Sequence, residues 1–169
     1  MLNKEQIERL IRGGGLIEGC IHLKTQLTPN GFDLTAGQIF SFVSAGRLDF
    51  SNKQRALSDT QEVVPRKAQC GDKFGWWELP PGAYKVRTNE TICLPLDLTA
   101  LSFSRSSLLR MGAWTQHGVW DAGFKGKGEF VLVVGNPRGI KIKQNARVAQ
   151  LVFFPTQETQ GYRGIYQEG

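Results

Sequence analysis

Between residues 31 and 154 the chain alternates short runs of β-branched and aromatic residues with turn-forming residues. Glycine and proline separate many of these runs, as at Pro80-Pro81-Gly82, and both residue types favour tight turns. The clearest runs cover residues 31–35, 38–43, 83–86, 91–94, 98–103, 129–134 and 147–154. Many short strands with frequent turns are typical of barrels and jelly rolls. The pattern therefore predicts an all-β fold, a jelly-roll-like β-barrel.

A short helix is predicted before the strands, over residues 2–12. Asn3 is a suitable N-cap, and Gln6 lies three residues later, which is the spacing of a capping box. The glycines at 13–15 end the helix, because glycine adopts the left-handed conformation at little cost. Three glycines are also found in phosphate-binding loops, but no strand precedes them here and no lysine-serine pair follows.

The length of 169 residues suits one domain. We expect a single domain over residues 1–169, in which residues 157–169 form a C-terminal arm. Residues 44–73 are polar and irregular, and we interpret them as a long excursion over the surface without an assigned role.

Charge and cysteine content narrow the function classes. The formal net charge of +6 favours an anionic partner, although it does not choose between nucleic acid, a nucleotide and simple solubility. The three cysteines are widely separated, which argues against a disulfide framework and for a reducing compartment. No apolar run is long enough to cross a membrane, so we expect a cytoplasmic protein without a membrane partner. His22 and His117 lie far apart without zinc-ligand spacing, so neither a zinc hydrolase nor a zinc deaminase is expected.

Residues 104–107 read Ser-Arg-Ser-Ser and follow a predicted strand. Hydroxyl groups beside the Arg105 guanidinium suit a phosphate, because the hydroxyls donate hydrogen bonds and the guanidinium adds a charged fork. A serine-rich turn that caps a helix is the structural alternative.

Residues 118–126 place Asp121 between apolar residues and a tight glycine turn. Near a triphosphate, such a carboxylate is able to hold and deprotonate a water molecule that attacks phosphorus. The structural alternative is that Asp121 caps the turn. Phe124 has two interpretations as well, a ring stacked against a deoxyribose or a member of the core.

Two further segments have polar residues in unusual places. In the strand predicted around residues 147–151, alternation puts Gln150 on the opposite side from Arg147. A glutamine amide inside a hydrophobic strand needs a polar partner, because its burial is otherwise costly. Near the C-terminus, Tyr162 and Tyr166 stand among glycines and one arginine, which suits an arm that folds over a ligand; a disordered tail is the alternative.

The order of these motifs resembles that of the trimeric dUTPases and the dCTP deaminases. Four dUTPase motifs are matched in order by residues 31–34, 105–107, 118–126 and 147–151, and the tyrosine-rich C-terminal segment stands in for the fifth. The N-terminal helix and residues 80–112 are similar to dCTP deaminases, so the resemblance covers nearly the whole chain outside residues 44–73. Two features depart from the dUTPase pattern. Phe124 stands where the third motif usually has tyrosine, and the tail lacks the glycine-rich phenylalanine pattern of the fifth motif.

The resemblance implies a homotrimer with active sites at subunit interfaces, Mg²⁺ on the triphosphate, and dUTP as the substrate, with dCTP as a second candidate. It implies no nucleic-acid partner. Asp121 would be the catalytic base, Phe124 would pack on the sugar, and Asp33 would support the metal indirectly or an arginine network. The remaining substrate-binding residues that the resemblance implies are Arg105, Ser106, Ser107 and Gln150 for the phosphates, Gly118, Val119 and Arg110 for the base, and Tyr162 and Tyr166 in the closing arm.

Position 131 separates the two chemistries. dCTP deaminases place a catalytic glutamate ten residues after the aspartate, where this chain has Val131. On a strand Glu129 has the same facing as Val131, so Glu129 becomes the candidate only if the hairpin slips or bulges. Arg110 matches an arginine that dCTP deaminases use near the base, which keeps deamination open.

We therefore predict that the protein hydrolyses dUTP to dUMP and pyrophosphate. A dCTP deaminase, monofunctional or bifunctional, and a non-catalytic nucleotide-binding protein of the same fold are the alternatives. Whether dCTP is also deaminated, and whether the arm closes over its own site or a neighbour's, stay open at this point.

Overall fold

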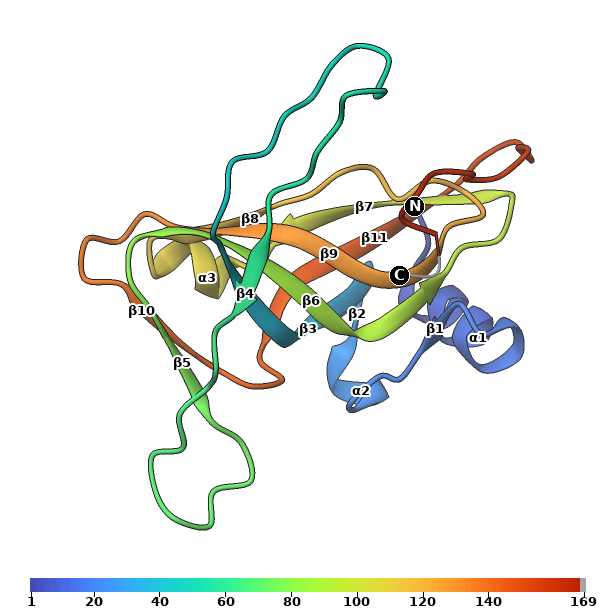
Figure 1. Ribbon diagram of the computed structural model, residues 1–169. Coiled ribbons are helices and arrows are strands. Elements are labelled where there is room, and N and C mark those ends of the chain that lie inside the picture. The colour runs from blue at the N-terminus through green and yellow to red at the C-terminus, as the bar shows by residue number, and fades with distance from the viewer. Residues whose placement is uncertain (168–169) are drawn as a thin grey trace.

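The structure is a computed structural model that describes residues 1–167, and strands make up most of its regular structure (Figure 1). The helices are α1 (Lys4–Gly14), α2 (Leu23–Gln26) and α3 (Ser106–Arg110). The strands are β1 (Ile17–Glu18), β2 (Leu27–Thr28), β3 (Gly31–Phe42), β4 (Thr60–Glu62), β5 (Trp76–Leu79), β6 (Gly82–Cys93), β7 (Leu98–Ser104), β8 (Ala113–Gln116), β9 (Lys125–Val134), β10 (Ile140–Lys143) and β11 (Arg147–Pro155).

Helix α1 confirms the predicted N-terminal helix, with both ends about two residues later than expected. The Asn3 side chain accepts a hydrogen bond from the Gln6 amide at 3.0 Å, and the Gln6 side chain accepts one from the Asn3 amide at 2.9 Å, so the capping box is complete. Gly15 ends the helix with a φ of 65°. Within the described part of the chain, no helix is long and apolar enough to cross a membrane.

The main sheet is antiparallel and runs in the order β7-β11-β3-β6-β9-β8, with β1, β2 and β4 as short additions. Its two edge strands meet at Ser104, whose hydroxyl accepts a hydrogen bond from the Thr115 amide at 2.7 Å and lies 3.2 Å from the Thr115 carbonyl oxygen. The sheet thus curls into a nearly closed barrel, which confirms the predicted fold class. The inward side chains form one core that includes Phe32, Ile39, Leu132, Leu151 and Phe153.

Strands β3 and β6 are longer than the sequence indicated. Residues 31–35 and 38–43 were expected as separate runs, but they form one strand that bulges at Gly37. A Cβ at Gly37 would lie 2.9 Å from the Asn89 side chain, so the close approach of β6 requires glycine there. In β6 the pairing skips from Arg87 to Thr91. The turn-like residues that suggested chain breaks therefore lie in bulges within continuous strands.

The bulge in β6 contains a fully buried carboxylate, that of Glu90. It accepts hydrogen bonds from the Gln26 side chain at 2.7 Å and from the Thr35 amide at 3.0 Å. These donors satisfy the hydrogen-bonding capacity of the buried carboxylate oxygens. They also fix the bulge against β3, immediately beside Arg87.

Residues 44–59 confirm the expected surface excursion, and they project from the barrel as a long loop (Figure 1). The same polar segment also contains the short strand β4, which pairs with β3. Strands β5 and β10, which were not predicted, form a separate two-stranded sheet. Lys141 and Lys143 lie on the exposed side of β10.

Candidate functional site

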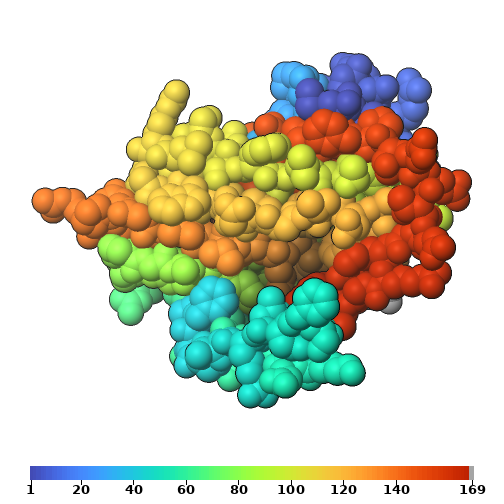
Figure 2. Space-filling model, turned by 90° about the horizontal axis from the view of Figure 1, so that it is seen from above, coloured from blue at the N-terminus to red at the C-terminus, as the bar shows by residue number. Residues whose placement is uncertain are grey.

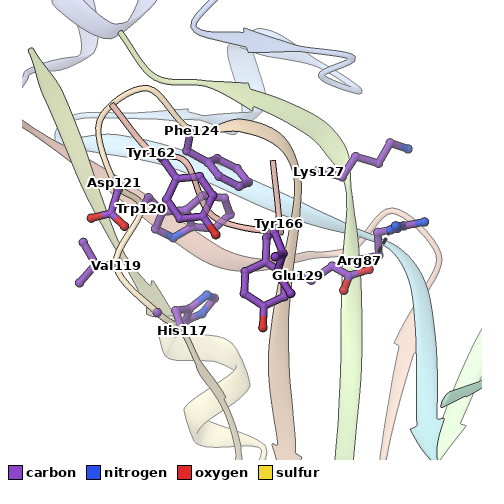
Figure 3. Close-up of a pocket in the computed structure, with 12 residues that line it drawn as sticks. Arg87, His117, Val119, Trp120, Asp121, Phe124, Lys127, Glu129, Tyr162 and Tyr166 are labelled. Atoms are coloured by element: carbon purple, nitrogen blue, oxygen red, sulfur yellow. Dashed lines mark ion pairs between the residues drawn. The ribbon is translucent and has the colours of Figure 1, made fainter. Parts of the chain in front are cut away.

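A cavity of about 390 Å³ lies between β9, the loop that precedes it and the C-terminal arm (Figure 3). Figure 2 shows a hollow in this region, with the arm (red) along one side and the 44–59 excursion (cyan) along another. The cavity is lined by Arg87, His117, Gly118, Val119, Trp120, Asp121, Phe124, Lys127, Glu129, Tyr162, Ile165 and Tyr166.

The loop of residues 117–124 is anchored to strand β7 through Trp120. The Trp120 amide and carbonyl both bond to Ala100, each at 3.0 Å. The Trp120 indole donates to the Ser102 hydroxyl at 3.2 Å. A Cβ at Gly128 would lie only 2.5 Å from the Trp120 ring, so the glycine in β9 makes the space that the indole occupies. These contacts hold the loop as one wall of the cavity.

Asp121 lies at the exposed start of a tight turn. The turn is closed by the main chain, because the Phe124 amide donates to the Asp121 carbonyl at 3.1 Å and Gly123 takes a φ of 79°. Among the described residues the Asp121 carboxylate has no hydrogen-bond donor and no ion-pair partner. The turn therefore does not depend on this side chain, and the carboxylate is free to act on a ligand.

Aromatic rings form the wall beside Asp121. The Phe124 ring lies edge-on to Trp120, at 5.6 Å between centroids, and edge-on to Tyr162, at 5.7 Å. Edge-to-face contacts of this kind are favourable and rigid. Phe124 packs against the core and also lines the cavity (Figure 3), so its place in the core is confirmed and its stacking on a deoxyribose stays a prediction.

The C-terminal arm lies against the hairpin of its own chain. The Thr159 amide donates to the Leu96 carbonyl at 3.0 Å, and the Tyr162 amide donates to the Ala122 carbonyl at 2.8 Å. The Gln167 side chain donates to the Gly123 carbonyl at 3.1 Å. Tyr162 and Tyr166 thereby line the cavity, and in this structure the arm closes over the site in cis.

Charged residues line the part of the cavity formed by β6 and β9. Glu129 forms ion pairs with Arg87 at 2.9 Å and with Lys85 at 3.2 Å. The Arg87 Nε is buried, and its contact with Glu129 is an ion pair rather than a hydrogen bond of regular geometry. Buried and more exposed side chains alternate along β9 without interruption, so Glu129 and Val131 lie on the same face of the strand, as expected. Glu129 lines the cavity without any slip of β9, and Val131 pairs with Gln116 outside the lining.

A second cluster lies apart from the cavity and is centred on Asp33. Its carboxylate is 1% exposed and forms ion pairs with Arg105 Nε and Arg147 Nη1, each at 3.1 Å. Burial raises the pKa of Asp33 above its ordinary value, while the two guanidinium groups oppose that rise. Asp33 was expected to support either the metal or an arginine network. Its contacts in the structure are those of an arginine network.

The remaining phosphate-binding candidates surround this second cluster. Gln150 Nε2 donates to the Thr28 hydroxyl at 2.6 Å, which supplies the partner that the sequence required. A bulge at 147–149 breaks the expected alternation of Arg147 and Gln150. Helix α3 has no side-chain cap, so the serine-cap alternative is wrong. Ser106, Ser107 and Arg110 are exposed on α3.

The predicted site residues thus separate into two groups. The cavity brings together Gly118, Val119, Asp121, Phe124, Tyr162 and Tyr166. It does not include Asp33, Arg105, Ser106, Ser107, Arg110 and Gln150. Sequence reasoning missed several lining residues, among them Arg87 and Lys127. Arg87 is distant from residues 118–126 in the sequence, and Lys127, which directly follows them, stands in no distinctive pattern.

His117 is the most distinctive of the missed residues. Burial lowers the pKa of His117 to about 4, so the imidazole is neutral near pH 7. Its ring packs on Phe130 at 4.3 Å between centroids. Neither ring nitrogen is solvent-exposed or hydrogen-bonded to a described residue. Its position directly before Gly118 was the signal that the sequence offered.

Comparison with known proteins relates the whole chain to one family. A family model described as dCTP deaminase-like matches residues 1–156. A probable deoxyuridine 5'-triphosphate nucleotidohydrolase of Methanosarcina mazei is 41% identical over 99% of this chain and 96% of the relative. The protein of the same description from Archaeoglobus fulgidus is 39% identical over 99% of this chain and 95% of the relative.

One solved structure supports the fold. The crystal structure of 2'-deoxycytidine 5'-triphosphate deaminase from Agrobacterium tumefaciens superposes with a TM-score of 0.63 at 20% identity. The match covers 90% of this chain and 46% of that chain. At this level of identity the likeness concerns the fold.

Proposed function

The chain belongs to the dCTP deaminase-like family, and on that premise we propose that it hydrolyses dUTP to dUMP and pyrophosphate. Its curated relatives at about 40% identity are named for this reaction and match over nearly their full length. The observation that carries the proposal is the unpaired Asp121 carboxylate beside an aromatic-walled cavity.

Asp121 acts as the general base. Its carboxylate accepts a proton from a water molecule, and the water oxygen forms a bond to the α-phosphorus. The bond from that phosphorus to the bridging oxygen breaks, and pyrophosphate leaves with the electron pair. The exposed position of Asp121 at the cavity rim suits a group that meets both solvent water and a phosphate.

The cavity holds the nucleoside. Phe124 packs on the deoxyribose, and its ring leaves no room for a ribose 2'-hydroxyl. The main chain of Gly118 and Val119 reads the pyrimidine edge, because neither residue has a polar side chain. Tyr162 and Tyr166 of the arm cover the bound nucleotide and exclude water.

The phosphate-binding residues come from another subunit. Arg105, Ser106, Ser107 and Gln150 lie outside the cavity of their own chain, so a single chain does not assemble the complete site. We therefore propose a homotrimer in which this second cluster faces a neighbour's cavity. Arg105, held by Asp33, then reaches the triphosphate.

Mixing two inactive variants tests the shared site. Asp121→Asn and Arg105→Ala are each expected to inactivate their own trimers. If the site is shared, mixed trimers regain activity, because about a quarter of the sites receive both intact residues in random assembly. Light scattering measures the assembly. A fully active monomer, or mixed trimers without any activity, contradicts the proposal.

Mg²⁺ is proposed as the metal, carried by the triphosphate. Among the described residues there is no cluster of three or more histidine, cysteine, aspartate or glutamate side chains. Asp33 is already paired with two arginines, so it would act on the metal only indirectly. When bound, the metal gathers phosphate oxygens and offsets their charge. Full activity in excess chelator contradicts this proposal.

dCTP deamination is the second candidate, favoured by one observation, that Glu129 lines the cavity. Its carboxylate is committed to Arg87 and Lys85, and Val131 has no proton to transfer. We therefore expect dUTP cleavage and no release of ammonia from dCTP. Incubation with each nucleotide and Mg²⁺, followed by chromatography and a coupled ammonia assay, distinguishes the two. Ammonia that disappears in Glu129→Gln assigns a deaminase.

We also propose that the protein works in the cytoplasm. Cys20, Cys70 and Cys93 are free thiols in the structure, which suits a reducing compartment.

A further inference from the structure

His117 combines burial with missing partners. Both imidazole nitrogens are shielded from solvent, and neither has a hydrogen-bond partner among the described residues. A buried polar atom without a partner is rare in native structures and costs free energy. The carbon atoms of the ring are well accommodated, since the ring packs on Phe130 at 4.3 Å. A phenylalanine would make the same packing contact without this cost, so the nitrogens themselves require an explanation.

The imidazole belongs to the cavity wall. His117 lines the cavity together with Val119 and Tyr166 (Figure 3). It directly precedes Gly118 in the loop. Among the described residues no charged group pairs with the imidazole, and burial lowers the pKa of His117. The ring is therefore a neutral group with one donor and one acceptor in either tautomer.

Asp121 and His117 lie at different depths in the cavity, and this difference suggests how a ligand is oriented. Asp121 is exposed at the rim, whereas the His117 nitrogens are shielded inside. A nucleotide whose phosphates meet Asp121 directs its base inward, toward His117. An uncharged pyrimidine with carbonyl oxygens suits a neutral imidazole, whereas phosphate oxygens suit a positively charged group such as Arg105 of the second cluster.

We infer that His117 is a specificity-determining residue, whose imidazole donates a hydrogen bond to a carbonyl oxygen of the bound pyrimidine. The inference rests on the proposed function, because it places a deoxyuridine nucleotide in this cavity. Binding displaces the side chains that shield the ring and gives one nitrogen its missing partner. Specificity arises because a ligand without that oxygen leaves the donor buried and unpaired.

The presence of only two histidines makes a direct measurement feasible. In protein labelled with ¹⁵N-histidine, a non-hydrolysable imido analogue of dUTP is expected to shift the His117 nitrogen signals toward a single hydrogen-bonded tautomer. His22 is exposed and lies outside the cavity, so its signals serve as the internal control and stay in place. Unchanged His117 signals at saturating nucleotide overturn the inference.

Variants and ligand analogues identify the bonded atom. His117→Phe keeps the ring on Phe130 but removes both nitrogens, and it is expected to bind dUMP about tenfold more weakly. 2-Thio-dUMP and 4-thio-dUMP each weaken one acceptor. The wild-type protein is expected to bind one of these thio analogues more weakly than it binds dUMP. His117→Phe is expected to bind that analogue and dUMP with equal affinity. His117→Gln, which retains a donor and an acceptor, should recover part of the affinity, and His22→Phe should match wild type.

The outcomes separate this inference from the proposed function. If the wild-type protein hydrolyses dUTP but His117→Phe and His117→Gln bind all three ligands as wild type does, only the role of His117 fails. If the His117 signals shift but neither thio substitution weakens binding in a way that depends on His117, the assignment of the hydrogen bond to the base is overturned. If the wild-type protein neither binds nor hydrolyses dUTP, the proposed function and the inference fail together.

Discussion

The cavity and the Asp33 cluster contain similar residue types in opposite states. In the cavity, neither the Asp121 carboxylate nor the His117 imidazole has a hydrogen-bond partner among residues 1–167. In the second cluster, Asp33 is 1% exposed and holds Arg105 and Arg147 in two ion pairs at 3.1 Å. Asp121 and His117 are thus free, whereas the charges of the second cluster are fixed. Groups that act on a ligand must be unoccupied before binding, whereas groups that only position a charge are best fixed in advance.

The largest expected effect comes from removing the free carboxylate. Asp121→Asn preserves the shape of the turn, which the main chain closes, but it removes the base. Turnover of dUTP should fall by about 100-fold or more, while the dissociation constant of the imido analogue changes little. Steady-state kinetics and calorimetry measure the two quantities. The control is Asp97→Asn, an exposed aspartate outside the cavity; equal turnover in both variants would remove Asp121 from the mechanism.

Breaking the fixed region is expected to act on both stability and binding. Asp33→Asn leaves two guanidinium groups without their carboxylate, so the free energy of unfolding should fall by about 3 kcal/mol. The KM for dUTP should rise about tenfold, because Arg105 loses its position. Denaturant unfolding and kinetics test this.

Glu8→Gln, which breaks an exposed pair with Arg12, is the matched control, with an expected loss below about 0.5 kcal/mol. If Asp33→Asn behaves like this control, the two arginines do not depend on Asp33.

The third prediction uses pH to test His117. Its pKa is lowered from 6.5 to about 4 in the folded protein. As the pH falls through 6.5, the unfolded chain takes up this proton and the folded protein does not, so stability is complete above pH 6.5 and declines toward pH 4. The loss between pH 7.5 and 4.5 should be about 2 kcal/mol.

Urea unfolding across this pH range, compared between wild type and His117→Phe, isolates the contribution. Asp121, Glu129 and Tyr166 share the cavity and remain in both proteins, so their titration cancels to first order. Parallel stability curves for the two proteins would show that His117 titrates normally.

The smallest effect concerns the arm. Gly123 has a φ of 79°, and a Cβ there would lie 2.8 Å from the Gly161 Cα of the arm. Gly123→Ala should therefore loosen the arm and raise the KM about threefold. Gly71→Ala is the matched control, since Gly71 also has a positive φ but nothing lies within 4 Å of its Cβ position. A Gly123 variant that matches the Gly71 variant in KM would exclude the arm contact.

Local sequence patterns predicted much of the fold. The capping residues Asn3 and Gln6 predicted α1, and alternation predicted the later strands, because burial on one face is recorded in the sequence itself. The bulges at Gly37 and in β6 were not predictable in this way. Their residues look like turn formers, and only the partner strand and the buried Glu90 carboxylate make them part of a continuous strand.

The site was predicted in part for a similar reason. Asp121 and Phe124 lie within one short motif, so their neighbourhood follows from the sequence. The pairing of Asp33 with Arg105 and Arg147 joins three distant segments, and spacing alone does not place them together. His117 was missed because it was considered only as a zinc ligand.

The hydrogen bonds of the arm have a kinetic consequence. Thr159, Tyr162 and Gln167 all donate to main-chain carbonyls, and the edge-on contact of Tyr162 with Phe124 adds a side-chain contact. Breaking these few bonds releases the arm while the barrel stays folded, and such segment motions take microseconds to milliseconds. We therefore expect the opening rate of the arm to set the residence time of the products of the proposed reaction.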